Sequence, residues 1–121
     1  MHSRSFLGID TDTENDLVMV QRTEGRTLYS KHFQNTSADI RALVGFIRAR
    51  CVRPRICLKA TTSAAMKLLE SLSGIPDVEV VFMSEAGLRM HRSLHASCGS
   101  AGRAVQNTQA ELLARCAERM V

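Results

Sequence analysis

Acidic side chains gather at the end of the first apolar run of the chain. Asp10 directly follows Phe6-Leu7-Gly8-Ile9, and Asp12, Glu14 and Asp16 come next at alternate positions. Carboxylates are the ligands that Mg²⁺ prefers and that metal-assisted phosphoryl transfer requires. A solvated acidic turn after a strand explains Asp12, Glu14 and Asp16 without any ligand. Asp10 is the candidate metal ligand, for example of a weakly bound single ion, and a turn residue after a strand is the alternative explanation of its position.

The chain is long enough to form one domain over residues 1–121. A chain of 121 residues, 45% of them hydrophobic, buries about two-thirds of the surface that its unfolded form exposes, so it can fold alone. It has one Tyr, four Phe and no Trp. Platforms of aromatic rings on which nucleic-acid bases stack are therefore not expected.

Charge and cysteine content limit which partners and which cellular compartment are expected. The 16 basic and 12 acidic side chains give a net charge of +4, which suits nucleic acid or another anionic partner. No apolar run approaches the roughly 20 residues that a membrane span needs, so no membrane partner is expected. The thiols of Cys51, Cys57, Cys98 and Cys116 lack the spacing of a zinc site and are typical of a reducing cytoplasm. We therefore expect a cytoplasmic protein.

The first third of the chain has the pattern of an antiparallel meander. Apolar runs at 6–9 and 17–20 predict strands buried on both faces. A more exposed third strand is expected over 28–33. Thr23-Glu24-Gly25-Arg26 places a glycine where a hairpin turn needs positive φ.

The remainder alternates between helices and strands. Apolar spacing of three and four predicts a helix over about 37–51, and strands from Ile56 and over 78–83 flank a helix that carries the apolar positions of 65–72. A strand, helix and strand in this order form a right-handed parallel crossover. The expected later elements are a short third helix carrying Leu88, His91 and Leu94, a flexible segment near 96–104, and a C-terminal helix near 108–120 that opens with a capping box.

Four short stretches resemble the N-terminal RuvC-like domain of the DEDD transposases, which include the Piv-type pilin-gene-inverting recombinases. They are Phe6-Leu7-Gly8-Ile9-Asp10, Thr23-Glu24-Gly25-Arg26, Lys59-Ala60-Thr61-Thr62, and Gln106-Asn107-Thr108-Gln109-Ala110 before Leu112-Leu113-Ala114. The resemblance implies an α/β protein of the RNase H-like fold. Its five-stranded mixed sheet would have three antiparallel strands, then two parallel ones, and flanking helices. It also implies an origin in a mobile element.

The catalytic positions that the resemblance implies have mostly lost their carboxylates. The four acidic residues of the family correspond to Asp10, Lys59, Gln106 and Gln109. Two Mg²⁺ ions bring four positive charges that one aspartate cannot offset. We therefore expect a degenerate site in which Asp10 is a relic, Lys59 forms an ion pair with it in place of metal, and no cofactor is required, Mg²⁺ being the only candidate.

Basic residues of the expected third helix and the segment after it are the candidates for phosphate contacts. Arg89 and Arg92 are three positions apart, and His95 and Arg103 follow. Contacts from such residues would be independent of base sequence and sensitive to salt. A solvated helix face is the alternative explanation of the same pattern.

Three functions remain open on the sequence. The first is a degenerate transposase-type domain that acts as a nucleic-acid-binding or regulatory and assembly module. The second is an active metal-dependent nuclease or recombinase fragment that uses Asp10 with nearby acids. The third is a module that binds only protein, as a homo-oligomer or with another partner, through an edge strand or the last helix.

Overall fold

The computed structural model of the chain describes residues 4–11, 16–59, 63–84, 86–90 and 109–119. The strands are β1 (Phe6–Asp10), β2 (Asp16–Thr23), β3 (Arg26–Gln34), β4 (Arg55–Lys59) and β5 (Glu79–Met83), and the helices are α1 (Ser37–Arg50), α2 (Ser63–Leu72) and α4 (Gln109–Arg119). A short helical segment covers 86–90. The predicted flexible segment near 96–104 lies outside the described residues.

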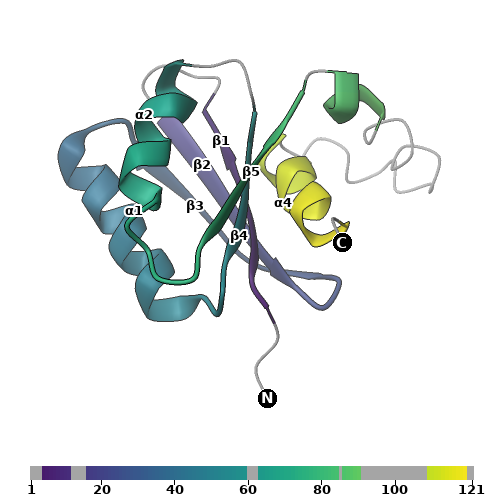
Figure 1. Cartoon of the computed structure of the whole chain (residues 1–121), viewed down its shortest axis with the longest axis horizontal. Coiled ribbons are helices and arrows are strands. Elements are labelled where there is room, and N and C mark those ends of the chain that lie inside the picture. Colours follow the sequence, from purple (N-terminus) through teal and green to yellow (C-terminus); the bar gives the residue numbers. More distant parts are fainter. Residues whose placement is uncertain (1–3, 12–15, 60–62, 85, 91–108, 120–121) are drawn as a thin grey trace.

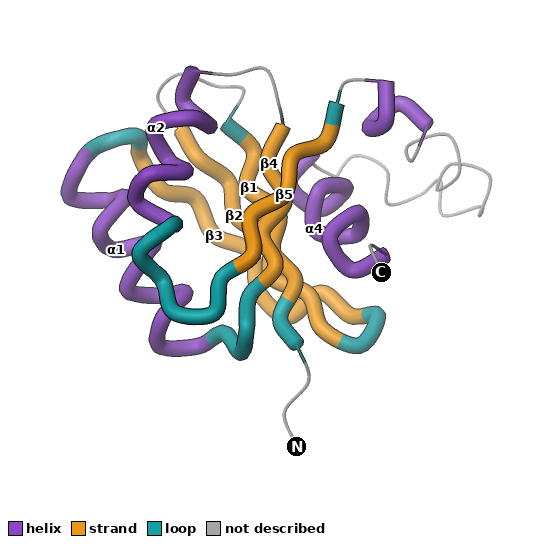
Figure 2. Tube along the Cα trace, viewed as in Figure 1, coloured by secondary structure: helices purple, strands orange, loops and turns teal. Residues whose placement is uncertain are grey.

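All five strands form one sheet in the order β3-β2-β1-β4-β5. β1 pairs antiparallel with β2, and β2 antiparallel with β3, whereas β4 is parallel to both of its neighbours, β1 and β5. Three antiparallel strands followed by two parallel ones is the arrangement expected of the RNase H-like fold, so the predicted fold class is confirmed. Figures 1 and 2 show the sheet between α1 and α2 on one side and α4 on the other.

The apolar runs of the sequence become strands that are covered on both faces. Successive side chains of a strand point to opposite faces. On β1, β2 and β4, the face towards α1 and α2 carries Leu7, Ile9, Leu17, Met19, Ile56 and Leu58. The intervening positions, which include Val18, Val20 and Cys57, pack with residues of α4. The continuous apolar runs therefore have the physical cause inferred from the sequence.

A close approach between α4 and β1 depends on Gly8. A Cβ atom at this position would overlap the carbonyl oxygen of Ala110 and the amide nitrogen of Ala114, and it would lie 2.7 Å from Cβ of Leu113. Ala110 and Ala114 are themselves fully buried small residues. Glycine in a strand often marks such a contact between backbones. It lets the axis of α4 lie directly on the central strand.

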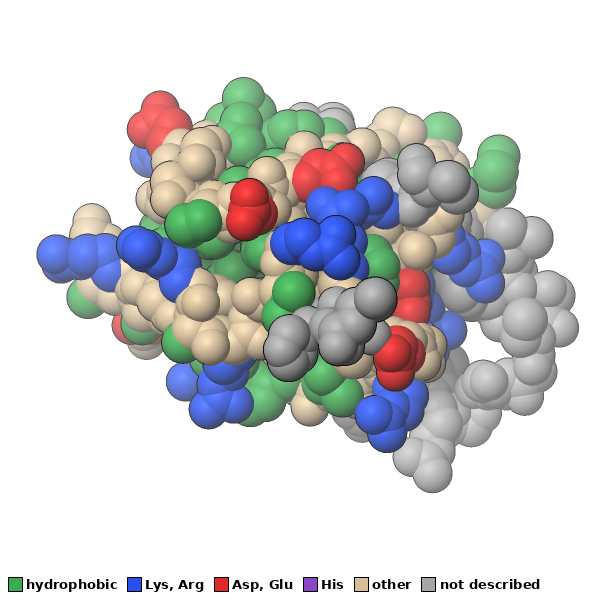
Figure 3. All heavy atoms as spheres, turned by 60° about the horizontal axis from the view of Figure 1, so that its bottom comes forward, with side chains coloured by type: hydrophobic (Ala, Val, Ile, Leu, Met, Phe, Trp, Pro, Cys, Tyr) green, Lys and Arg blue, Asp and Glu red, His purple; other side chains and the backbone are tan. Residues whose placement is uncertain are grey.

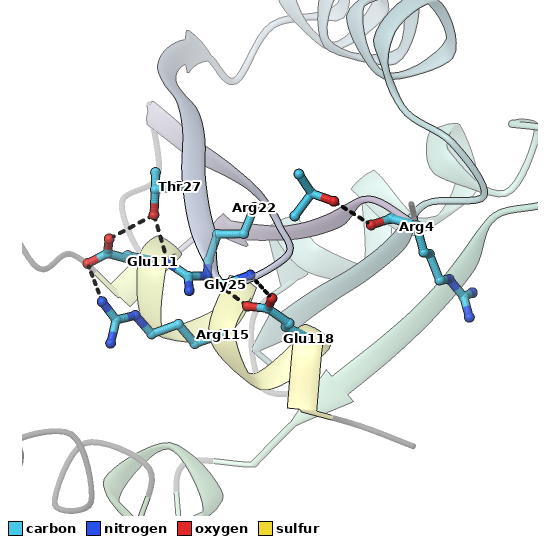
Figure 4. Close-up of polar contacts among 8 residues, drawn as sticks. Arg4, Arg22, Gly25, Thr27, Glu111, Arg115 and Glu118 are labelled. Carbon is cyan, nitrogen blue, oxygen red and sulfur yellow. Dashed lines mark hydrogen bonds and ion pairs between the residues drawn. The ribbon is translucent and has the colours of Figure 1, made fainter. Parts of the chain in front are cut away.

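Polar contacts hold the far end of α4 to the β2–β3 hairpin (Figure 4). Arg22 Nε donates to Glu118 Oε1 over 3.0 Å, and the Gly25 amide donates to Glu118 Oε2 over 2.5 Å. Gly25 has φ of +79°, in the left-handed region that the sequence predicted for this turn. Thr27 adds a 3.1 Å hydrogen bond to Glu111. The hairpin thereby fixes α4 along its length.

At the amino ends of the parallel strands, two arginines share one carboxylate. Arg4 Nη2 and Arg55 Nε lie 2.7 and 2.9 Å from Glu79 Oε1. Their hydrogen bonds and charges, that of Arg55 first, lower the pKa of Glu79. The segment before β1 is thus joined to the edge strand β5 through a half-exposed ion pair.

We expect Gly8→Ala to destabilise the fold strongly. The added methyl group meets backbone atoms of α4, which cannot rotate away, so overpacking should cost at least about 2 kcal/mol in the free energy of unfolding. Urea denaturation followed by circular dichroism measures this cost. Gly45→Ala is the matched control, because a Cβ there meets nothing within 4 Å and alanine favours helix by about 0.5–1 kcal/mol. Equal stability of the two variants would contradict the packing described for Gly8.

The Glu79 ion pairs should contribute to the pH dependence of stability. Because the pKa of Glu79 is lower in the folded chain, its contribution is complete above the unfolded value of about 4.3 and is lost as the pH falls through the folded pKa. Glu79→Gln should therefore destabilise the chain at pH 7 and reduce the fall in stability on acidification. Urea unfolding at pH 7 and pH 3 tests this, with the exposed Glu70→Gln as control.

Candidate functional site

The candidate site lies where two parallel strands end side by side. β1 ends at Asp10 and β4 ends at Lys59. The two strands are in register, with Ile9 opposite Leu58, so Asp10 and Lys59 each stand one position further along neighbouring strands. Ile9 and Leu58 face α1 and α2. By the alternation of side chains, Asp10 and Lys59 face the α4 side of the sheet.

The first residue of α4 completes this group. Gln109 Nε2 donates a hydrogen bond to Asp10 Oδ1 over 3.2 Å, between groups that are both partly buried. The two residues are 99 positions apart, and the packing of α4 over Gly8 brings them together. The structure therefore unites two positions that the resemblance assigns to one site, and it places Lys59 on the adjoining strand.

The side chains at this edge do not fit a pair of divalent ions. Such a centre needs several carboxylates around two cations about 3.5–4 Å apart. Here one carboxylate, Asp10, accepts a hydrogen bond from an amide, and the neighbouring strand ends in an ammonium that repels a cation. Over the described ranges, no three acidic, histidine or cysteine side chains gather as metal ligands would. The described contact within this group is the hydrogen bond from the Gln109 amide to the Asp10 carboxylate.

The other predicted site residues are less closely placed. Arg89 is exposed on the helical segment 86–90. Arg92, His95, Arg103 and Gln106 lie outside the described residues, as do Asp12 and Glu14. Asp16 begins β2 opposite Gln34. The predicted ion pair of Asp10 with Lys59 remains a prediction.

The residues that position α4 and the end of β1 were not identified from the sequence. Gly8 was interpreted only as part of a strand motif, although a glycine within an apolar strand can itself signal a close backbone approach. Thr11, directly after Asp10, is 2% exposed, and nothing in its type or spacing indicated burial. The Arg22–Glu118 pair joins residues 96 positions apart, which no local pattern reveals.

The described cysteines are structural groups of the core. Cys57 of β4 and Cys116 of α4 are buried in one apolar cluster. Burial raises the pKa of Cys57 to about 12 and that of Cys116 to about 11. Burial also raises the pKa of Cys51 to about 11. Because the thiolate is the nucleophile, these three thiols are inert at neutral pH.

Comparison with models of known protein families and with curated protein sequences finds no match for this chain. Among the helices of the described residues, none has the length and apolar character to cross a membrane. Fold and site geometry therefore carry the functional argument.

The ion pair between Asp10 and Lys59 can be tested with a double-mutant cycle. Asp10→Asn and Lys59→Gln, alone and combined, should show a coupling of about 0.5–1 kcal/mol in the free energy of unfolding at low salt. A control cycle pairs Asp10→Asn with Lys67→Gln, because Lys67 is exposed on α2, on the other side of the sheet. Coupling no larger than in the control cycle would show that the pair does not form.

Proposed function

We propose that this chain is a catalytically degenerate RuvC-like domain of the transposase type, derived from a mobile element and retained to bind nucleic acid without cutting it. In this role it serves as an accessory or regulatory module of a nucleoprotein assembly. The fold class, the four sequence stretches and the position of Asp10 on the central strand support this origin. The defining property of the domain is the replacement of acidic metal ligands by residues that do not bind Mg²⁺.

The hydrogen bond between Gln109 and Asp10 is the observation that carries the proposal. The resemblance places carboxylates at both positions, and two carboxylates at 3.2 Å would repel each other unless a cation lay between them. An amide in place of the second carboxylate removes this repulsion and donates a hydrogen bond instead. The site is thereby stable without metal.

Lys59 supports the same conclusion by its charge. It ends the strand next to β1, at the position where the resemblance has a glutamate. Replacing a carboxylate with an ammonium changes the local charge by two units and turns attraction for Mg²⁺ into repulsion. Aspartate, lysine and glutamine form a neutral group, whereas the family's acids would form a strongly negative one.

The net charge of +4 favours nucleic acid as the partner over a neutral protein surface. Phosphate contacts supply affinity for any sequence, weaken with salt and require no carboxylate site. A domain that has lost its metal ligands can therefore keep this affinity. Binding and cleavage separate physically because they depend on different side chains.

The direct test incubates the chain with duplex and single-stranded DNA and RNA at two salt concentrations, with and without Mg²⁺ or Mn²⁺, and scores binding and cleavage together. We expect salt-sensitive binding and no cleavage. Metal-dependent cleavage that disappears in Asp10→Ala would establish the active nuclease instead. Absence of both activities would favour the module that binds only protein.

Restoring the acids should restore affinity for metal. Lys59→Glu combined with Gln109→Asp would place two further carboxylates beside Asp10, so 5 mM Mn²⁺, about a hundred times a Kd of 50 µM, should raise the stability of this variant by roughly 2–3 kcal/mol. The unaltered chain and the neutral variant Lys59→Gln with Gln109→Asn should show no such shift in thermal denaturation. A shift of equal size in the unaltered chain would contradict the degenerate site.

A further inference from the structure

The positive charge of the chain is concentrated in one segment. Residues 26–50 contain five Arg or Lys side chains and a single acid, Asp39, a net charge of +4. The whole chain has 16 basic and 12 acidic side chains, so the remainder has 11 of each and is neutral. This segment forms β3 and α1.

Packing between α1 and β3 places basic side chains along their junction. Tyr29 of β3 stacks on Phe46 of α1 with ring centroids 4.8 Å apart. The Arg50 guanidinium lies 4.9 Å from the Phe46 centroid and 5.7 Å from that of Tyr29. On β3, Lys31 Nζ lies 5.2 Å from the Phe33 ring. The aromatic rings thus orient Arg50 and Lys31, both of which are exposed.

The outer side of α1 adds two more arginines among small residues. Arg41, Gly45 and Arg48 follow one another at helical spacings of four and three, and all are exposed. The other exposed positions of this side are the small residues Ser37, Ala38, Ala42 and Ala49. Small residues allow a bulky chain to approach the helix closely.

No carboxylate in the described part of the chain pairs with Arg41 or Arg48. The single acid of the segment, Asp39, is used locally, because its Oδ2 accepts a 2.7 Å hydrogen bond from the Gln34 amide. Figure 3 shows a group of Lys and Arg side chains at the left, the end of the molecule at which α1 lies in Figure 1. We use the name β3–α1 face for two adjoining groups, Lys31 and Arg50 at the junction with β3 and Arg41 and Arg48 on the outer side of α1.

The chemistry of the β3–α1 face fits a phosphodiester backbone better than a base or a lipid. Tyr29 and Phe46 stack on each other and are only partly exposed, which leaves no open aromatic platform for bases. Among the described residues, the exposed large apolar side chains are Leu28 on β3, Met66, Phe82 and Met90. None of them is on α1, so the helix itself has no apolar edge to insert into a membrane. Guanidinium groups on a floor of small residues suit phosphates.

We propose that the β3–α1 face is the nucleic-acid-binding surface, and that it contacts phosphates of the backbone through Lys31, Arg41, Arg48 and Arg50. It lies on the side of the sheet opposite the candidate site, so a strand held here does not reach Asp10. The inference rests on the proposed nucleic-acid role and gives it a location. It differs from the sequence-based prediction, which placed the contacts at Arg89 and the residues after it.

Gly45→Glu is the variant that tests the location. A carboxylate between Arg41 and Arg48, at four and three positions, would neutralise these two cations, and the open space at Gly45 would accept the side chain without repacking. Affinity for a 20-base-pair duplex at 50 mM salt should fall at least about tenfold. The slope of log K against log salt, about −3.6 for four phosphate contacts, should weaken to about −1.8.

Gly45→Gln is the matched control of equal size and neutral charge, and it should keep affinity within about twofold of the unaltered chain, since neither cation is neutralised. Arg89→Gln should also bind normally. Loss of binding in Arg89→Gln but not in Gly45→Glu would overturn the β3–α1 face and leave the nucleic-acid role intact. No binding by the unaltered chain to duplex or single strands would contradict that role itself. Equal binding to phosphatidylserine vesicles, lost in Gly45→Glu, would assign the face to membranes and overturn the proposal.

Discussion

The contact between α4 and the central strand at Gly8 is the constraint on which the other features depend. It exists because position 8 has no Cβ, so the helix backbone can lie against β1. From this contact follow the burial of Cys57 and Cys116 between sheet and helix and the meeting of Gln109 with Asp10. The site is thus a product of helix–strand packing. The positions of Asp10 and Gln109 depend on how α4 packs on β1 and do not require a bound metal ion.

The positive charge of the chain and its group of candidate site residues lie on different elements. At the carboxyl edge of the parallel strands stand one carboxylate, one ammonium and one amide, at Asp10, Lys59 and Gln109, whose formal charges sum to zero. The segment 26–50, which forms the edge strand β3 and the helix α1, carries a net charge equal to that of the whole chain. Under the proposed function, attraction of a polyanion would arise at β3 and α1, and the neutral group at the end of β1 would take no part in it.

The fold followed from the sequence because its signals are local. Continuous apolar runs, helical spacing and the Gly25 turn are each contained within a few residues, and the parallel pairing of β4 with β5 follows from the strand–helix–strand order. The site was predicted only in part, because the resemblance named Asp10, Lys59 and Gln109 but not what holds them. The close contact of Gly8 with α4 and the Arg22–Glu118 pair each join residues about a hundred positions apart. Hydrophobic periodicity contains no information about such pairs.

The position of α4 in the chain has a consequence for how the protein is made. β1 is complete at Asp10, but the helix that covers its second face begins only at Gln109. During synthesis at about 5–20 residues per second, that apolar sheet face stays exposed for roughly 5–20 s after β1 has left the ribosome. The nascent chain is therefore vulnerable to aggregation until α4 emerges, and shielding by a chaperone over that interval should raise the yield of folded protein.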